Sequence, residues 1–426
     1  MQKFIDLFAG IGGLRLGFEQ AAAQLNIAAK AVFSAEIKPH AIKVYSENFH
    51  ENSHCDITTV NESNLPNFDF LLAGFPCQAF SNAGKRLGFD DTRGTLFFDV
   101  ARIIRAKNPK GFLLENVEGL LTHNGGETLR TIIRILTDLG YFVDFAVLDS
   151  KNFGLAQSRK RIYICGGKSG KIPLDELEKS EKPPKTAVLA DIIENDIPPI
   201  ETAFTKKLFS HFNITDVIGK QIKDKRGGAA NIHSWDFALK GEISQEQKNL
   251  LALLLKKRRS KKWAEIYGID WMDGMPLTFA MIKTFFDVDN LQALLDDLVA
   301  KNYLVLEFPK KKAKNARIYD KTQEKGYNIV TGKLSFEFNR ILDPNQLTPT
   351  LVATDMLKLA VPVGGGLRTL TKRESLRLFG FPENYTLDSV TQNEAFDLLG
   401  NTVCVPVVAE VAKILIKSAK GAVDNG

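Results

Sequence analysis

The stretch that decides the fold is FIDLFAGIGG at residues 4–13. It is an apolar run that breaks into glycines and leads into the amphipathic residues 14–25. A strand that ends in a glycine turn and opens a helix is typical of a parallel sheet that binds a ligand at the carboxyl ends of its strands. Glycine permits a tight turn and a close ligand because it has no side chain. The stretch therefore predicts a ligand site after the first strand.

Glu36 supports a cofactor site at the same edge of the sheet. It follows the apolar run 31–35, where a carboxylate can accept hydrogen bonds from both hydroxyls of a ribose. The glycines are an imperfect dinucleotide fingerprint, because Arg15 stands where G-x-G-x-x-G has its third glycine. NAD, S-adenosylmethionine and a purely structural turn beside a surface glutamate all remain open at this point.

The first 166 residues alternate short apolar runs with amphipathic stretches, which is typical of repeated βαβ units. Unbroken apolar strands between helices favour a sheet that is covered on both faces. The predicted fold class is therefore α/β, with a doubly wound, mostly parallel sheet. The expected strands are residues 4–8, 31–35, 68–73, 112–114, 142–148 and 162–165, and the expected helices are residues 14–25, 41–49, 96–106 and 128–139.

The composition is that of a globular protein. The 426 residues are 44% hydrophobic and 25% charged, which excludes disordered, collagen-like and low-complexity chains. The net charge of +6 hints at a polyanionic partner. No apolar run reaches about 18 residues and the N-terminus lacks the pattern of a signal peptide, so we expect neither secretion nor a membrane.

The cysteines and histidines give no sign of disulfides or metal. Cys55, Cys77, Cys165 and Cys404 are widely spaced, and none forms a C-x-x-C pair. The six histidines form no H-E-x-x-H motif and none stands with a paired cysteine. We therefore expect a reducing, cytoplasmic compartment and no metal site.

The middle of the chain is predicted to be a second domain. Residues 178–185 are polar and proline-rich, which indicates a linker or a surface excursion. Beyond them the chain is rich in Lys, Arg and Asn, and it contains the basic runs 256–262 and 310–314. Such runs are more often solvated faces, but here we expect them to contact phosphates. Residues 281–308 suggest the helix, helix and strand order of a winged-helix unit.

Cys77 is expected at the carboxyl edge of the sheet, because GFPCQ at residues 74–78 directly follows the buried run 70–73. A thiolate there is nucleophilic when a cation or a helix N-terminus lowers its pKa, whereas an isolated cysteine is more often a small buried hydrophobe. The loop at residues 81–94 is basic and punctuated by glycines. It suits closure over a phosphate-bearing substrate, and equally an idle surface loop.

A carboxylate and two guanidiniums follow at further strand ends. Glu115, in the sequence ENV, ends an apolar strand, where an acid is costly unless it is paired or used. Arg159 and Arg161, in QSRKR, alternate so that both point to one face of the next strand. Two aligned guanidiniums suit a base edge, a phosphate or a carboxylate. A structural ion pair would give the same pattern.

Together these motifs resemble those of the DNA (cytosine-5)-methyltransferase family. The resemblance covers about residues 1–167 and 347–415, and the order of PCQ, ENV and QxRxR makes it highly specific. It implies a Rossmann-like S-adenosylmethionine-dependent methyltransferase fold with a second, smaller target-recognition domain. The matching segments are residues 6–13, Glu36, Asp56, and residues 74–78, 115–117, 157–161, 368–382 and 400–403.

The resemblance implies methyl transfer from S-adenosylmethionine to carbon 5 of a cytosine flipped out of double-stranded DNA. Cys77 would attack carbon 6 of the ring, and Glu115 would hold N3 and the exocyclic amine. Arg159 and Arg161 would hold the base oxygen and steady Glu115. The other expected substrate-binding residues are Gln78, Ser81, Lys85, Arg86, Arg93, Asn116 and Gln157.

The cofactor residues are also implied by the resemblance. Phe8 would stack on the adenine, Glu36 would bind the ribose, and Asp56 would bind the adenine amine. The C-terminal segment would close the site, with the helix 405–418 beside the first strand. The full expected set is Phe8, Gly10, Gly12, Gly13, Leu14, Glu36, Ile37, Asp56, Ile57, Pro76, Asn401 and Val403.

The expected domains are residues 1–170 completed by 385–426 for catalysis, and residues 171–384 for target recognition, with the winged-helix-like segment near 275–320. Within the recognition domain, Arg226, Asn231, His233 and Arg317 are candidates to read bases. We expect a cytoplasmic, nucleoid-associated monomer of a prokaryote. A cognate restriction endonuclease would act on the same DNA sequence without a stable complex.

Three alternatives differ in what they explain. A NAD-dependent oxidoreductase gives no reason for PCQ or for the large basic insert. A non-catalytic DNA-binding protein predicts erosion of Cys77, Glu115 or the arginines, and all are present. A tRNA cytosine-5 methyltransferase shares the chemistry and stays the main alternative, although a large middle domain better suits a DNA groove.

Overall fold

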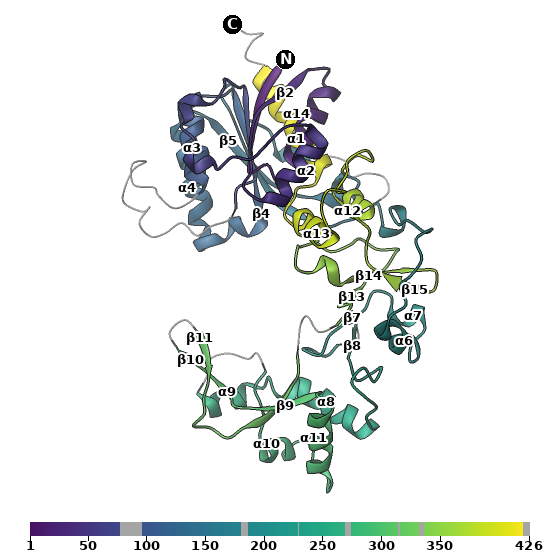
Figure 1. The fold of residues 1–426 in the computed structure, drawn as a ribbon. Helices are drawn as coiled ribbons and strands as arrows, with labels where there is room; N and C mark the ends of the chain where they lie inside the picture. The colour runs from purple at the N-terminus through teal and green to yellow at the C-terminus, as the bar shows by residue number, and fades with distance from the viewer. Residues whose placement is uncertain are drawn as a thin grey trace. The chain divides into compact units, whose positions relative to one another are not determined.

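The computed structural model describes residues 1–76, 96–179, 186–228, 230–268, 274–313, 316–331 and 336–420. The chain forms two compact units, each built from separate stretches of sequence. The first comprises Met1–Glu194, Pro344–Leu357 and Leu370–Gly426, and the second comprises Asn195–Asp343 and Lys358–Thr369. Figure 1 shows the course of the chain through both.

These boundaries differ from the predicted ones at 170 and 385. The first unit keeps residues 171–194 because they bond to segments that return to it much later in the chain. The Leu189 amide donates to the Gln346 carbonyl at 3.1 Å, and Glu194 accepts a hydrogen bond of 2.7 Å from the Thr371 hydroxyl.

The first unit contains a six-stranded sheet in the order β2-β1-β3-β4-β6-β5. Strands β1 to β4 run parallel, while β6 lies antiparallel between β4 and β5. The predicted mostly parallel α/β sheet is therefore confirmed. The strands are β1 Gln2–Leu7, β2 Ala29–Ala35, β3 Phe70–Ala73, β4 Gly111–Val117, β5 Phe142–Asp149 and β6 Lys160–Gly167.

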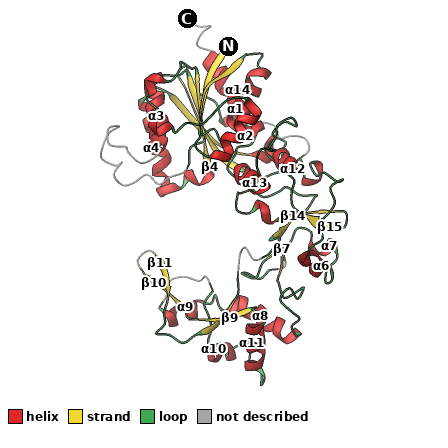
Figure 2. Ribbon diagram, in the orientation of Figure 1, coloured by secondary structure: helices red, strands yellow, loops and turns green. Residues whose placement is uncertain are grey.

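Helices cover both faces of this sheet, as Figure 2 shows. Helix α1 packs against α14, which also contacts β4 and β6, while α4 packs against β5 and α3. The central strand β3 needs this cover because it is apolar throughout and every one of its residues is buried. The helices of this unit are α1 Gly13–Gln24, α2 Pro39–Phe49, α3 Leu96–Lys107, α4 Glu127–Asp138, α5 Asp175–Lys179, α12 Lys372–Leu378, α13 Gln392–Gly400 and α14 Val405–Lys420.

The C-terminal helix α14 is a core element. Its partner is α1 more than the first strand, which differs from the expectation, because Gly17 of α1 lets the two helix backbones come close together. A Cβ on Gly17 would lie 2.4 Å from Cγ1 of Val408 and 3.0 Å from the Val405 carbonyl oxygen. By length and composition Gln392–Ala419 would pass as a membrane span, but 72% of its apolar window is buried inside the protein.

The second unit has a small five-stranded sheet in the order β15-β14-β13-β7-β8, and two antiparallel pairs, β9 with β12 and β10 with β11. The predicted order of helix, helix and strand is present as α10, α11 and β9; the winged-helix comparison stays a prediction. The elements are α6 Ala203–Phe209, α7 Ile214–Val217, β7 Gln221–Ile222, β8 Asn231–Ile232, α8 Gln245–Lys257, α9 Lys261–Tyr267, α10 Phe279–Lys283, α11 Leu291–Ala300, β9 Leu304–Glu307, β10 Lys310–Ala313, β11 Ala316–Tyr319, β12 Gly326–Ile329, β13 Arg340–Ile341, β14 Leu359–Val363 and β15 Gly366–Arg368.

The contact between α1 and α14 makes a prediction about stability. Gly17→Ala should lower the free energy of unfolding by about 1–3 kcal/mol, because the added methyl group overlaps Val408. Gly119→Ala is the matched control, since a Cβ there has its nearest neighbour at 4.0 Å; it should change stability by less than about 0.5 kcal/mol. Urea denaturation of both variants checks this, and equal stabilities would contradict the close packing.

Candidate active site

A cavity of about 500 Å³ lies at the carboxyl edge of the sheet in the first unit. Its walls come from the glycine turn after β1, the residues after β2, the ends of β3 and β4, the start of β6, and the segment between α13 and α14. Cavities of this size suit a small organic ligand. The lining residues are Phe8–Ile11, Gly13, Leu14, Glu36–Lys38, Ala41, Gly74–Pro76, Leu96, Glu115–Val117, Arg159, Arg161, Leu398 and Gly400–Val403.

The glycine turn holds its shape through backbone conformations that most residues avoid. Gly10 and Gly12 have φ of +54° and +76°, and Phe8 has φ of +55°, which is uncommon for a residue with a side chain. Such strain persists where the surroundings enforce it, frequently at functional sites. One of the groups that holds this turn is the Tyr385 hydroxyl, which donates to the Ile11 carbonyl at 2.5 Å. The turn therefore depends on a segment from the far end of the chain.

Glu36 is fixed by three backbone amides. Its Oε2 accepts from the Gly10 amide at 2.8 Å, and its Oε1 accepts from the amides of Ile37 and Lys38, also at 2.8 Å. A carboxylate offers about four acceptor positions, so Oε2 keeps capacity for a further donor. Beside it, the Ile37 side chain is 64% exposed although it is apolar. An oriented acceptor next to an apolar surface suits the ribose and the base of an adenosine.

Glu115 and Arg161 form the polar wall of the cavity. Nε of Arg161 lies 3.1 Å from Oε1 of Glu115, and their side chains are only 13% and 12% exposed. In the antiparallel pair of β4 and β6, Val117 lies opposite Arg161, so Glu115 and Arg161 occupy diagonal positions on one face. Burial raises the pKa of Glu115, and the charges of Arg161 and Arg159 oppose that rise. The carboxyl group is therefore held nearer to its protonated form than an exposed glutamate.

Arg159 has other partners than the sequence predicts. Its Nη1 donates to the Leu351 carbonyl at 2.8 Å, and its Nη2 donates to the carbonyls of Gly400 and Thr402 at 3.0 and 2.7 Å. Burial lowers its pKa to about 10. These bonds use three of the five N–H groups of the guanidinium, and its buried Nε has no partner among the described residues, so the expected contact with a base oxygen stays a prediction. Arg159 holds the segment Gly400–Val403 against the sheet, while Arg161 faces Glu115.

Asn116 positions the segment that leads to the predicted nucleophile. Its Nδ2 donates to the Phe75 carbonyl at 2.9 Å, and its Oδ1 accepts from the Val117 amide at 2.8 Å. The amide is thus turned toward the backbone, although the residue lines the cavity. Pro76 is exposed at the cavity and is followed in sequence by Cys77.

Most of the expected cofactor residues line this one cavity: Phe8, Gly10, Gly13, Leu14, Glu36, Ile37, Pro76, Asn401 and Val403. Gly12 does not, since its missing side chain makes room for the Phe49 ring. Asp56 does not either, because its carboxylate caps a short helix through Thr58, and Ile57 is buried in the core. Gln157 is fully buried, with its amide bonded to the backbone of Leu378 and Leu351.

Several predicted residues lie outside the part of the chain that the structure describes. These are Cys77, Gln78, Ser81, Lys85, Arg86 and Arg93, together with the loop 81–94.

The sequence analysis assigns no role in the site to several other cavity residues, because they carry no distinctive chemistry. Phe75, Leu96 and Val117 supply apolar walls, and such residues are common everywhere in the chain. Lys38 has a possible sequence signal, since it follows Glu36 closely, but its ammonium group pairs with Asp397. Leu398 is recognised only once α13 is seen to end at the cavity.

Comparison with known proteins gives a consistent result. Residues 2–417 match the family described as C-5 cytosine-specific DNA methylase. The Type II methyltransferase M.NlaIV of Neisseria lactamica is 54% identical over 97% of this chain and 98% of its own length. M.BanI of Aneurinibacillus aneurinilyticus is 40% identical over 98% and 96%. Among solved structures, the Dnmt2 methyltransferase of S. pombe is similar in fold, with a TM-score of 0.54 and 17% identity over 98% of this chain and 99% of that one.

The bonds of Arg159 make a prediction about stability. Arg159→Met should lower the free energy of unfolding by about 3 kcal/mol, because three buried carbonyls lose their donor. Lys160→Met is the matched control, since that side chain is 53% exposed and its nearest acid is 3.7 Å away; it should change stability by less than about 0.5 kcal/mol. Urea denaturation of both variants measures their free energies of unfolding. An Arg159→Met protein as stable as the control would rule out the structural role.

Proposed function

Since this chain belongs to the C-5 cytosine-specific DNA methylase family and is a DNA cytosine-5-methyltransferase, we propose that the cavity described above is its active site. The observation that carries the proposal is the buried pair of Glu115 and Arg161 on the wall of a cavity that also contains the glycine turn. An acid whose pKa is raised by burial, beside a fixed cation, is a frequent feature of catalytic sites.

The cofactor of this family is S-adenosylmethionine, which supplies the methyl group. The cavity fits it: about 500 Å³ of space, a carboxylate oriented by three amides, and apolar neighbours. We assign Glu36 to the ribose hydroxyls, with Phe8 and Ile37 beside the adenine. The backbone of Gly10 and Gly13 leaves room for the remaining part of S-adenosylmethionine, and Asn401 and Val403 close the cavity.

The chemistry that the residues provide follows from the weak nucleophilicity of carbon 5 of cytosine. Attack of the Cys77 thiolate on carbon 6 forms a carbon–sulfur bond and turns carbon 5 into the nucleophilic end of an enamine. Glu115, whose pKa is raised by burial, donates a hydrogen bond to ring N3 in its protonated form as negative charge builds there. Arg161 keeps the carboxyl group in place through its bond of 3.1 Å. S-adenosylmethionine, when bound, would supply the methyl group that carbon 5 accepts. Loss of the proton from carbon 5 and cleavage of the bond between carbon 6 and sulfur then restore the aromatic ring and give 5-methylcytosine with a free Cys77 thiol.

Arg159 and Asn116 act through other groups in this scheme. Arg159 is a positioning residue, because its guanidinium holds the segment Gly400–Val403 that lines the cofactor side. Asn116 is a positioning residue for the Phe75–Pro76 segment that precedes Cys77. A cytosine within a duplex cannot reach such a cavity, so the base must be flipped out of the helix.

We assign recognition of the DNA sequence to the second unit, Asn195–Asp343 and Lys358–Thr369. The restriction-modification context of the related enzymes supports a role in protecting DNA from a cognate endonuclease that acts on the same sequence. A monomer in the cytoplasm of a prokaryote, associated with the nucleoid, completes the proposal.

The activity and the nucleophile are tested together. Unmethylated plasmid incubated with the purified protein and S-adenosylmethionine should yield bisulfite-resistant cytosines at one short motif. Cys77→Ser should abolish them, because an alcohol is a far weaker nucleophile than a thiolate. Cys55→Ser, at a half-buried free thiol, is the matched control and should retain activity. An active Cys77→Ser protein would exclude Cys77, and a folded wild-type protein that modifies tRNA but no DNA would exclude DNA as the substrate.

Substitution of Glu115 should strongly reduce activity and should also remove a loss of stability that the wild type undergoes as the pH rises. Glu115→Gln should reduce kcat by about 10²- to 10⁴-fold, because the amide cannot supply an acidic proton. Because burial raises the pKa of Glu115, the folded wild type binds this proton more tightly than the unfolded chain. Its stability therefore falls as the pH rises from about 4.5 through the raised pKa, and this loss is absent in the variant.

The measurement is urea denaturation of both proteins at several pH values between 4 and 8, beside kinetics at each. The stability of Glu115→Gln relative to wild type should increase as the pH rises. Glu118→Gln removes a carboxylate that is 49% exposed and should change neither property appreciably. A Glu115→Gln protein with wild-type kcat, or with relative stability that decreases as the pH rises, would contradict the proposed role.

A further inference from the structure

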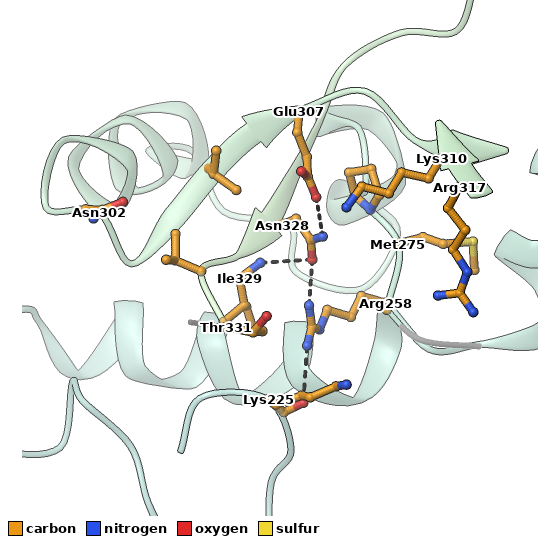
Figure 3. A pocket seen from close by; sticks show the side chains of 14 residues that line it. Lys225, Arg258, Met275, Asn302, Glu307, Lys310, Arg317, Asn328, Ile329 and Thr331 are labelled. Carbon is orange, nitrogen blue, oxygen red and sulfur yellow. Dashed lines mark hydrogen bonds between the residues drawn. The ribbon is translucent and has the colours of Figure 1, made fainter. Parts of the chain in front are cut away.

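The second unit contains a cavity of about 400 Å³ that the reaction described above does not use (Figure 3). It is bounded by the end of α8, by β9 and β12, and by the β-ribbon made of β10 and β11. Its polar lining includes Lys225, Arg258, Glu307, Lys310, Arg317 and Asn328.

One wall of this cavity is fixed by a chain of hydrogen bonds. Asn328 donates from Nδ2 to Oε1 of Glu307 at 2.7 Å and accepts at Oδ1 from Nη1 of Arg258 at 2.6 Å. Nη2 of Arg258 donates to the Lys225 carbonyl at 3.2 Å. Figure 3 shows these groups in a row across the cavity. Arg258 belongs to the basic run expected to contact phosphates, yet it is only 2% exposed, so it organises this wall instead.

The ribbon of β10 and β11 presents cations to the same cavity. Lys312 pairs with Arg317 and Lys310 pairs with Tyr319 across the ribbon, and residues directly opposite each other lie on one face. Lys310 and Arg317 line the cavity, so this is the face that borders it. The Tyr319 hydroxyl donates to Oε2 of Glu307 at 3.1 Å, which ties the ribbon to the fixed wall. Lys311 lies on the opposite face, paired with Asp320 at 3.1 Å.

The charged and polar residues that line the cavity indicate the chemical class of its ligand. Four cations and one carboxylate line it, which favours an acceptor-rich group. None of the described lining residues is aromatic, so an unstacked base has no ring to stack on here. Glu307 would repel a phosphate, but it suits the edge of a base pair that also offers a donor. The major-groove edge of a G·C pair does so: guanine presents O6 and N7 as acceptors, and cytosine presents its N4 amino group as a donor.

We propose that this cavity reads a G·C pair of the target sequence, with Arg317 bonding to O6 and N7 of the guanine and Glu307 accepting from the cytosine amino group. This rests on the proposed function, in which the second unit binds DNA. A two-stranded β-ribbon fits the major groove, and arginine on guanine is the commonest specific contact there. Asn328 and Arg258 keep Glu307 and the ribbon in register with the base pair.

The experiment measures sequence choice and total activity separately. A library of DNA duplexes with random flanks is methylated by the wild-type protein, and bisulfite sequencing gives the motif. Arg317→Gln should still methylate DNA but accept other pairs at one position that is G·C for the wild type, with discrimination reduced roughly 10- to 100-fold. Lys311→Gln removes the same charge from the opposite face of the ribbon. It should leave the motif unchanged, whatever its effect on the overall rate.

A modified substrate tests the contact itself. At the position found above, 7-deazaguanine removes the N7 acceptor and preserves base pairing. It should slow the wild type but leave Arg317→Gln unaffected, and Arg317→Lys should give an intermediate loss of discrimination because it keeps the charge without the guanidinium fork. Circular dichroism confirms that the variants are folded.

Two results would overturn the proposal. One is an Arg317→Gln protein that loses activity equally on all sequences with a weaker salt dependence, which is the behaviour of a phosphate contact. The other is an unchanged motif together with equal sensitivity of wild type and variant to 7-deazaguanine. If the wild type methylates no DNA at all, the proposed function itself fails, and this result is distinguishable because it appears before any variant is compared.

Discussion

The first unit depends on the hydrogen bonds that the guanidinium of Arg159 donates. It bonds to carbonyl groups of Leu351, Gly400 and Thr402, which come from segments that the chain reaches only after leaving for the second unit. Backbone carbonyls that are buried without a hydrogen-bond donor are costly. The guanidinium supplies these donors, and so it favours the packing of the later segments of the chain against the first unit. The cofactor side of the cavity and the sheet that carries Glu115 are joined by the same group. Sequence motifs that are widely separated therefore act as one site.

The parts of the molecule that could be predicted from sequence are those set by local pattern. Apolar runs bounded by glycine and polar turns gave the strands and helices of the sheet, since burial on both faces leaves no other composition. The carboxyl ends of parallel strands meet at one edge, so Glu36 and Glu115 were expected near each other, and both line one cavity. These inferences needed only patterns formed by residues that lie close together in the sequence.

The parts that escaped prediction depend on partners distant in sequence. Gln157 has the side chain of a substrate-binding residue, but Leu378 and Leu351 occupy its amide. Arg258 reads as one more charge in a basic run, and only the fold shows that Asn328 and the Lys225 carbonyl bury it. In each case a polar group met backbone or side chains that no local pattern identifies.

The discontinuity of the first unit has a consequence for biosynthesis. The glycine turn and all six strands of the sheet are complete by Gly167, whereas the segment Gly400–Val403 and the helix that covers α1 come at the end of the chain. At ordinary rates of translation, the interval takes on the order of ten to fifty seconds. During that time a nascent chain carries the sheet with the face of α1 that contains Gly17 uncovered and its cavity open on one side. The cofactor site can close only after residues 400–403 and α14 have been synthesised.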